Sequence, residues 1–299
     1  MNTLIVITGP TGVGKTAAAI EVAQQLNSEI VNADSRQVYR GLPIGTAAPT
    51  AAEQALVRHH LVACRNLDES YSASQFEADV MALLPQLWRQ GPVAVMCGGS
   101  MMYVDAVCHG IDPLPDISPA IRQQTLDQLH TQGLPSLLAD LERLDPAYFA
   151  EVDRCNPRRV VHAVEICRQA GVPYSSLRTG QRRERPFRIV KVAIDMDRDT
   201  LYDRINRRVD TMMATGLLDE ARSVYHLRHL NALNTVGYKE LFAHFDGSTP
   251  LAEAVRLIKR NTRHYAKKQL TWLARDNNLL HCTPRDVWPT IERELKVDY

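Results

Sequence analysis

The chain has 299 residues and a formal net charge of +1, with 45% hydrophobic and 23% charged residues. Such values are ordinary for a globular protein, so they exclude extensive disorder and a surface governed by one sign of charge. No stretch approaches the about eighteen consecutive apolar residues that a membrane span needs, and the N-terminus carries no basic segment with a cleavage site. We therefore expect a cytoplasmic protein with no membrane partner.

Six cysteines are dispersed along the chain, and none of them forms a CxxC pair. Disulfide frameworks and zinc sites depend on paired or regularly spaced cysteines. The spacing therefore indicates reduced thiols with mostly structural roles.

Short β-rich runs alternate with a helical pattern in the first third of the chain. Strands are predicted at residues 4–8, 29–32 and 93–97, and a helix is predicted at residues 16–26. This alternation is typical of a parallel sheet covered by its crossover helices. The predicted fold class is therefore α/β, with a parallel sheet core and helices on both faces.

Two interruptions divide the chain further. Three prolines between residues 111 and 119 break the pattern, and an arginine-rich run at residues 178–188 precedes a strand at residues 189–194. The segment between these breaks has few strand signals and a leucine repeat of helical spacing, which favours an amphipathic packing face. The repeat consists of Leu134, Leu137, Leu138, Leu141 and Leu144.

We predict a discontinuous core with a helical insertion. The first part of the core spans residues 1–112, and the insertion spans residues 113–187. Residues 188–299 complete the core and end in helices. The sequence contains no internal repeat that would favour a different organisation.

A phosphate-binding motif follows the first predicted strand and precedes the first predicted helix. It fits G-x-x-x-x-G-K-[ST] and reads Gly9, Pro10, Thr11, Gly12, Val13, Gly14, Lys15 and Thr16. In such a P-loop, backbone N–H groups and the helix dipole face an anion, Lys15 adds a positive charge, and the Thr16 hydroxyl can hold Mg²⁺. We therefore predict a site that binds the phosphates of a small molecule, with Mg²⁺ as cofactor.

The strand at residues 93–97 differs from its counterpart in many nucleotide triphosphatases. In those enzymes an apolar strand ends in an Asp that positions the metal. Here the strand at residues 93–97 is followed by Gly98, Gly99 and Ser100. The missing carboxylate weakens a plain triphosphatase interpretation. The two glycines permit close approach of a ligand or a neighbouring loop, although a simple turn explains them equally well.

Asp34 directly follows the second predicted strand. Residues past the carboxyl ends of parallel strands face the ligand crevice, so Asp34 should lie near the P-loop. A carboxylate there can hold a metal through water or act as a general base. The alternative is a helix N-cap formed by Asp34 or Ser35.

Several motifs, taken in chain order, resemble the tRNA dimethylallyltransferase family, also called tRNA isopentenyltransferases. The motifs are residues 9–16, Asp34 to Thr46, Ser72 to Phe76, Gly98 and Gly99, Asn156 to Val160, Gly237 to Glu240, and Thr262 to Gln269. A P-loop alone occurs in many families, whereas this ordered set covers nearly the whole chain. The zinc-finger extension of eukaryotic members is missing, so the resemblance favours a bacterial type.

Three departures from the family pattern accompany the resemblance. Met101 stands where the family has the third glycine of Gly-Gly-Thr-Gly-Leu-Tyr, which implies a different loop shape. Ala48 replaces a usual lysine, and His162 replaces a usual arginine. These last two changes imply softer RNA contacts with unchanged chemistry.

The resemblance implies a transferase. Its substrates would be dimethylallyl diphosphate and the anticodon stem-loop of tRNA, with transfer to the exocyclic amine of the adenosine 3′ to the anticodon. Lys15 and Mg²⁺ near Thr16 would stabilise the departing diphosphate, and Asp34 would accept the amine proton. Arg207 or Arg208 would add positive charge at the diphosphate, unless both are solvated helix charges. We expect a monomer.

The resemblance also implies the residues that contact tRNA. Asp34, Ser35, Arg36 and Gln37 would lie at the target base, which must be flipped out of the loop to be reached. Further contacts are implied for Ser100, Arg122, Arg158, Arg159, Val160, Val161 and His162.

A basic helix predicted at residues 256–275 independently favours a polyanionic partner. It contains seven basic residues and no acid, namely Arg256, Lys259, Arg260, Arg263, Lys267, Lys268 and Arg275. Such a stripe is typical of phosphate-backbone binding, and Arg263, Lys267 and Lys268 are the contacts that we predict; a solvated face is the alternative. Tyr265 and Trp272 could stack on RNA or belong to the core.

The arginine-rich run between the two parts of the core suggests a mobile clamp formed by Arg182, Arg183 and Arg185. Two other functions stay open on the residues alone. A small-molecule or nucleoside kinase fits the P-loop and a lid at residues 178–188, but it leaves the basic helix unexplained. A non-catalytic, GTPase-like RNA-binding module would need a guanine-reading Asn-Lys-x-Asp sequence, which is missing.

Overall fold

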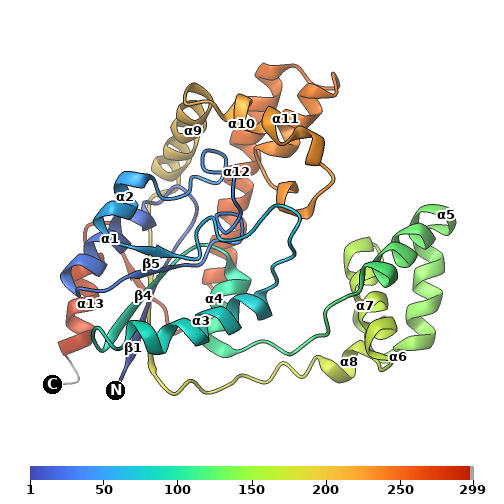
Figure 1. Ribbon diagram of the computed structural model, residues 1–299, viewed down its shortest axis with the longest axis horizontal. Helices are drawn as coiled ribbons and strands as arrows, with labels where there is room; N and C mark the ends of the chain where they lie inside the picture. Colours follow the sequence, from blue (N-terminus) through green and yellow to red (C-terminus); the bar gives the residue numbers. More distant parts are fainter. Residues whose placement is uncertain (297–299) are drawn as a thin grey trace. The chain divides into compact units, whose positions relative to one another are not determined.

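The computed structural model describes residues 1–296, and this part of the chain forms a six-stranded parallel sheet (Figure 1). The strand order is β3-β2-β4-β1-β5-β6. The strands are β1 (Thr3–Thr8), β2 (Ile30–Asn32), β3 (His59–His60), β4 (Val93–Cys97), β5 (Arg188–Ile194) and β6 (Leu280–Cys282). The central strand β1 pairs with β4 on one side and β5 on the other, so the sheet joins segments on either side of the insertion.

Apolar side chains of the central strand alternate between two cores. Leu4 and Val6 belong to one buried cluster, whereas Ile5 and Ile7 belong to the other. Successive side chains of a strand point to opposite faces, so both faces of the sheet need helical cover. The predicted α/β class, with helices on both faces, is confirmed.

The helices of this α/β unit pack on the two faces. They are α1 (Lys15–Gln25), α2 (Ala51–Leu56), α3 (Ala73–Leu87), α4 (Met101–His109), α9 (Arg198–Ala214), α10 (Leu217–Ser223), α11 (Tyr238–Phe245), α12 (Leu251–Leu273) and α13 (Val287–Lys296), with 3₁₀ turns at Tyr225–Leu227 and Asn231–Leu233. Helices α3, α4, α10 and α11 contribute to the core with Leu4, and α1 and α13 contribute to the core with Ile5. Helices α9 and α12 supply residues to both, so they pass the edge where ligands bind in such folds.

Residues His109–Glu184 form a second compact unit made of helices. They are α5 (Pro119–Leu144), α6 (Pro146–Glu151), α7 (Pro157–Ala170) and α8 (Tyr174–Leu177). Leu137 and Leu141 are fully buried in its core with Ala163, as the leucine spacing predicts. Gly133 has φ +75°, and the helix axis of α5 breaks there.

The chain passes between the two units at residues 108–109 and 184–185. Arg185 closes this junction on the side of the α/β unit: its Nε donates to the Val107 carbonyl at 2.8 Å, and its Nη2 lies 2.5 Å from Glu77 Oε1. Its side chain is only 9% exposed. The clamp role predicted for Arg185 is therefore wrong, because its guanidinium satisfies carbonyls at the end of α4 that the helix leaves without partners.

The structure gives the state of the cysteines and the apolar character of the helices. All six cysteines are free thiols. Within residues 1–296, no helix has both the length and the apolar character that a membrane crossing requires.

Candidate functional site

The P-loop lies between β1 and α1 and owes its shape to glycine. Gly9, Gly12 and Gly14 have φ values of +147°, +87° and +107°, which other residues rarely adopt. A Cβ on Gly9 would stand 2.9 Å from the Ile194 carbonyl oxygen, so the loop lies directly against the end of β5. Gly14 caps α1 without a side-chain hydrogen bond, which leaves the helix N-terminus open to an anion.

Lys15 folds back over the loop that precedes it. Its Nζ donates to the carbonyls of Gly9 at 3.0 Å and Pro10 at 2.9 Å. Burial lowers the pKa of Lys15 to about 8, although nearby Cys97 and Asp34 raise it. At neutral pH the ammonium is therefore charged in most molecules and held in one position, ready to meet an anion bound by the loop.

Asp34 begins the turn that follows β2. Its Oδ1 accepts hydrogen bonds from the backbone N–H of Arg36 at 2.8 Å and of Gln37 at 3.4 Å. The turn does not continue into an α-helix. Asp34 therefore caps a turn, and it is not the N-cap of a helix. Within the described chain, Asp34 Oδ2 has no hydrogen-bond partner, which leaves one carboxylate oxygen available to a ligand.

Three other groups share the electrostatic environment of Asp34. Asp34 raises the pKa of Lys15 and of Arg208, opposing the burial that lowers both. Burial raises the pKa of the Tyr265 hydroxyl to about 12, and Asp34 adds to that shift. The expected proximity of Asp34 to the P-loop is thus present as a cluster of one carboxylate, two cations and one phenol.

Helix α9 supplies the arginines of this cluster. Arg204 Nε donates to the Gly12 carbonyl at 2.9 Å, and Ile205 fills the space where Gly12 has no side chain. Arg208 lies one turn further along and is partly buried, whereas Arg207 is exposed. Of the two predicted arginines, Arg208 therefore belongs to the cluster. The sequence reasoning missed Arg204, although its spacing of four residues from Arg208 placed both on one helix face.

The loop after β4 packs tightly against the turn after β2. A Cβ on Gly98 would stand 2.2 Å from the Ala33 carbonyl oxygen, so the close approach that glycine permits is to a neighbouring loop. The buried Ser100 accepts a hydrogen bond from Ser35 N–H at 2.8 Å and donates to Ser35 Oγ at 3.1 Å. Ser100 thus fixes the turn that carries Asp34. Met101 is the first residue of α4, a position that does not need glycine.

The side chains of Arg36 and Gln37 brace the same turn. Arg36 Nη1 donates to the Asn231 carbonyl at 2.9 Å, and Gln37 Nε2 donates to the Thr46 carbonyl at 3.0 Å. Both residues were predicted at the target base, and both are part of the structure that holds Asp34 in place.

Glu220 anchors the segment between this turn and α2. Its carboxylate accepts hydrogen bonds from the N–H groups of Ile44 and Gly45 at 2.8 and 2.7 Å, and from the Tyr238 hydroxyl at 2.6 Å. A Cβ on Gly45 would stand 2.5 Å from that hydroxyl oxygen, so only glycine fits. The sequence reasoning missed Glu220, because a half-buried acid on an otherwise charged helix gives no local signal.

The predicted acid-free basic helix is wrong in two respects. Helix α12 begins at Leu251, so Glu253 lies within it, and it ends at Leu273, so Arg275 lies beyond it. Arg256 Nη2 pairs with Glu253 Oε1 at 2.6 Å. The stripe therefore carries its own acid in the first turn, where the helix dipole favours a negative charge.

The neighbouring helix α9 neutralises one further cation of α12 and hydrogen-bonds another. Lys259 pairs with Asp210 of α9 at 2.5 Å, and Arg263 donates to Asn206 Oδ1 at 2.6 Å. Lys267 and Lys268 are exposed and have no ion-pair partner within residues 1–296. Arg260, Lys267 and Lys268 thus present positive charge that no carboxylate pairs with in the described part of the chain.

The insertion carries the remaining predicted contacts. Arg158, Arg159 and His162 are exposed near the N-terminus of α7, and Arg122 Nε lies 3.8 Å from a Glu165 carboxylate oxygen. Val161 is half-buried. The side chain of Val160 is fully buried in the core of the insertion, so an RNA contact of this residue would have to come from its backbone. An apolar residue at helical spacing from other core residues is a packing residue.

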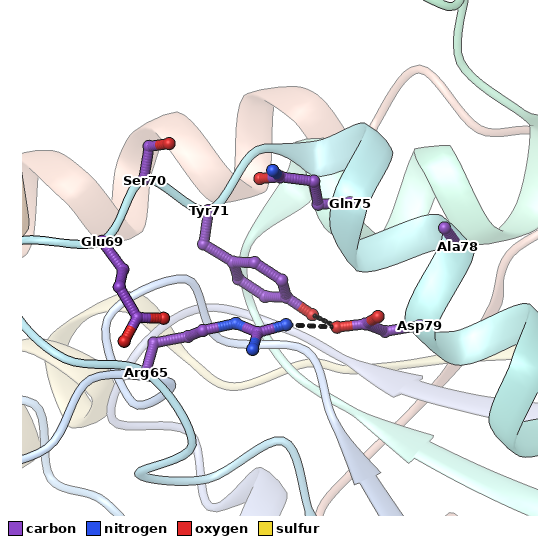
Figure 2. Close-up of a pocket in the computed structure, with 7 residues that line it drawn as sticks. All are labelled: Arg65, Glu69, Ser70, Tyr71, Gln75, Ala78 and Asp79. Atoms are coloured by element: carbon purple, nitrogen blue, oxygen red, sulfur yellow. Dashed lines mark hydrogen bonds and ion pairs between the residues drawn. The ribbon is translucent and has the colours of Figure 1, made fainter. Parts of the chain in front are cut away.

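A pocket of about 480 Å³ is lined by residues other than those of the P-loop (Figure 2). Figure 2 shows Asp79 in contact with two other lining residues: its Oδ2 lies 2.7 Å from Arg65 Nη2 and accepts from the Tyr71 hydroxyl at 2.6 Å. The lining consists of Arg65, Glu69, Ser70, Tyr71, Gln75, Ala78 and Asp79, and it includes no predicted site residue.

Comparisons with known proteins agree over most of the chain. Residues 37–276 match the family model described as IPP transferase. The chain is 56% identical to tRNA dimethylallyltransferase 2 of Parabacteroides distasonis over 92% of each chain. It is 53% identical to tRNA dimethylallyltransferase 1 of Bacteroides thetaiotaomicron over 93% of this chain and 91% of the relative.

Solved structures show the same fold. The tRNA isopentenylpyrophosphate transferase of Bacillus halodurans superposes with a TM-score of 0.73 at 35% identity, covering 99% of this chain and 97% of that one. A eukaryotic dimethylallyltransferase acting on tRNA superposes with a TM-score of 0.80 at 25% identity, covering 99% and 78% of the respective chains.

Proposed function

The chain belongs to the IPP transferase family, and from this premise we propose that it transfers a dimethylallyl group from dimethylallyl diphosphate to tRNA. The acceptor is the exocyclic amine of the adenosine 3′ to the anticodon, and the product is N6-isopentenyladenosine. The observation that carries the proposal is the cluster around Asp34, in which a carboxylate with an open oxygen interacts electrostatically with Lys15 of the P-loop and with Arg208.

The leaving-group side of the reaction uses the P-loop. As the allylic C–O bond breaks, negative charge grows on the diphosphate. The N–H groups at the start of α1, the fixed Lys15 ammonium and Arg208 oppose that charge in a partly dry site, where such groups act most strongly. The Gly9 and Pro10 carbonyls hold the Lys15 ammonium in place before the donor arrives, so little reorganisation is needed there.

Magnesium fits the donor set at this end. Mg²⁺ prefers oxygen ligands and keeps several waters, and proteins often bind it through few side chains together with substrate phosphates. The Thr16 hydroxyl at the first turn of α1 would hold it. When bound, the ion supplies charge stabilisation to the diphosphate. The described residues contain no cluster of three or more His, Cys, Asp or Glu side chains that would form a separate metal site.

The accepting side uses Asp34. An adenine amine is a poor nucleophile because its lone pair is delocalised into the ring. Asp34 Oδ2 accepts a hydrogen bond from the amine and then its proton as the C–N bond forms. A well-placed general base of this kind contributes roughly 10² to 10⁴ in rate. The Ser100 and Arg36 contacts keep the turn, and thus the carboxylate, in position.

The tRNA would be held by exposed positive charge on both compact units. Lys267 and Lys268 on α12, with Arg158 and Arg159 on α7, supply side chains suited to the phosphate backbone. The adenosine has to leave its stack to reach Asp34, which costs least from a single-stranded loop.

The test is direct. The protein is incubated with Mg²⁺, labelled dimethylallyl diphosphate and unmodified tRNA, and the nucleosides are analysed by mass spectrometry. One isopentenyl group on a single adenosine per tRNA supports the proposal. Phosphoryl transfer from ATP to a small molecule, without modification of RNA, would instead favour the kinase alternative.

A further inference from the structure

Gln269 is a buried side chain at the P-loop that the chemistry above does not use. It projects from α12 and is only 2% exposed. Its Oε1 accepts from the Thr11 N–H at 2.8 Å, and its Nε2 donates to the Gly99 carbonyl at 2.8 Å. Both ends of the amide are thus engaged, one of them by a backbone N–H of the phosphate-binding loop itself.

The amide of Gln269 lies close to the Lys15 ammonium. A Cβ on Gly99 would stand 2.4 Å from Gln269 Nε2 and 3.4 Å from Lys15 Nζ, so one point in space touches both groups. The same point lies 3.5 Å from the Gly9 carbonyl oxygen. Gln269 therefore fills the volume between the loop after β4 and the first half of the P-loop, next to the Lys15 ammonium.

This position matters for the number of phosphates that the loop can hold. In a P-loop, the N–H groups at the helix N-terminus bind the inner phosphates, and the lysine reaches toward the outermost one. A third phosphate needs space past the lysine and donors to receive it. Here the Thr11 N–H already has an acceptor, and the volume next to the Lys15 ammonium holds an amide that is hydrogen-bonded at both ends. A buried polar group that loses its partner is costly, so this amide resists displacement.

We propose that Gln269 is a specificity-determining residue that limits the P-loop to two phosphates, so that the site accepts a diphosphate and rejects a triphosphate. This inference rests on the proposed function and refines it, because it explains how a P-loop selects an allylic diphosphate in the presence of nucleoside triphosphates. Since no covalent step is involved, the proposal concerns binding alone.

Calorimetric titration of the full chain in Mg²⁺ tests the proposal, with inorganic pyrophosphate and inorganic tripolyphosphate as ligands. The wild type should prefer pyrophosphate by about tenfold or more. In Gln269→Ala, and in Gln269→Asn, whose shorter side chain cannot span both partners, that preference should shrink through tighter binding of tripolyphosphate. Thr271→Ala, an exposed change on the same helix, should keep the wild-type preference.

Several outcomes would overturn the proposal. Equal binding of the two ligands by the wild type would do so, as would an unchanged preference in both variants. Loss of pyrophosphate binding in both variants would show that Gln269 is needed to bind the diphosphate. It would then have no separate role in limiting the number of phosphates. Transfer to tRNA by the wild type is measured in parallel, because its failure contradicts the proposed function and leaves the phosphate preference a separate result.

Discussion

The cations of the P-loop cluster and those of α12 differ in what surrounds them. Lys15 is partly buried and held by two carbonyl oxygens, and Arg208 is partly buried within the electrostatic reach of Asp34. On α12, Arg256 and Lys259 pair with carboxylates near the surface, and Lys267 is left to solvent. Charge in the first region is concentrated where water is scarce, whereas charge in the second is spread and partly neutralised. Substitutions in the first region should therefore change chemistry, and those in the second should change RNA affinity.

The largest effect is expected from Asp34→Asn. Turnover should fall by roughly 10² to 10⁴, because the amide cannot accept the amine proton, while affinity for dimethylallyl diphosphate is retained. Single-turnover transfer and equilibrium donor binding measure the two quantities. The exposed Asp68→Asn serves as the matched control and should behave as wild type. Undiminished transfer by the Asp34 variant would remove this carboxylate from the mechanism.

A second contrast lies within α9. Arg208→Ala should lower kcat by about 10², the loss typical when one preorganised donor to a developing charge is removed. Arg207→Ala should have little effect, because that side chain is exposed and lies outside the cluster. Steady-state kinetics of the two variants, side by side, checks the assignment. If both lose activity equally, the burial difference between them has no bearing on catalysis.

The depressed pKa of Lys15 predicts a pH dependence of donor binding. Affinity should fall as pH rises through about 8, by up to about tenfold per pH unit, because the ammonium loses its proton. Lys15→Arg, if it binds donor, should remove this dependence, since a guanidinium stays charged. Titrations of donor from pH 7 to 9.5 decide the matter, and a flat wild-type profile would contradict the placement of Lys15 at the diphosphate.

The same shift has a consequence for stability. The folded pKa of about 8 lies below the ordinary value of 10.5, so between these pH values the unfolded chain binds more protons at Lys15 than the native one. The contribution of this group to the free energy of unfolding therefore rises with pH over that interval. Denaturant titrations of the unliganded protein at several pH values measure this change in the free energy of unfolding, with Lys15→Met as the reference.

The smallest effect is expected on α12. Lys267→Ala should reduce the salt dependence of tRNA binding by about one unit of slope, as loss of one phosphate contact does. Lys259→Ala should change the slope less, because Asp210 already neutralises that ammonium. Binding measured at several salt concentrations separates the two variants. Equal slopes would mean that pairing with α9 does not persist in the RNA complex.

Local pattern predicted the frame of the site. The strand at residues 93–97 and the P-loop between a strand and a helix follow from hydrophobic runs and glycine placement, and the position of Asp34 follows from the geometry of parallel strands. The local sequence pattern could not predict contacts between segments that are distant in the chain. Gln269 reaches Thr11 across 258 positions, and Asp210 neutralises Lys259 from another helix. Such pairs depend on tertiary packing, which the spacing of charges along one helix does not encode.

The structure of a ternary complex would test the central claim most directly. The protein would be crystallised with Mg²⁺, a non-reactive thio analogue of dimethylallyl diphosphate and an anticodon stem-loop RNA. We expect the N–H groups at the start of α1 and Lys15 to bind the diphosphate. The amine of the everted adenine should lie within about 3 Å of an Asp34 carboxylate oxygen. Diphosphate and adenine in two unconnected cavities would contradict it.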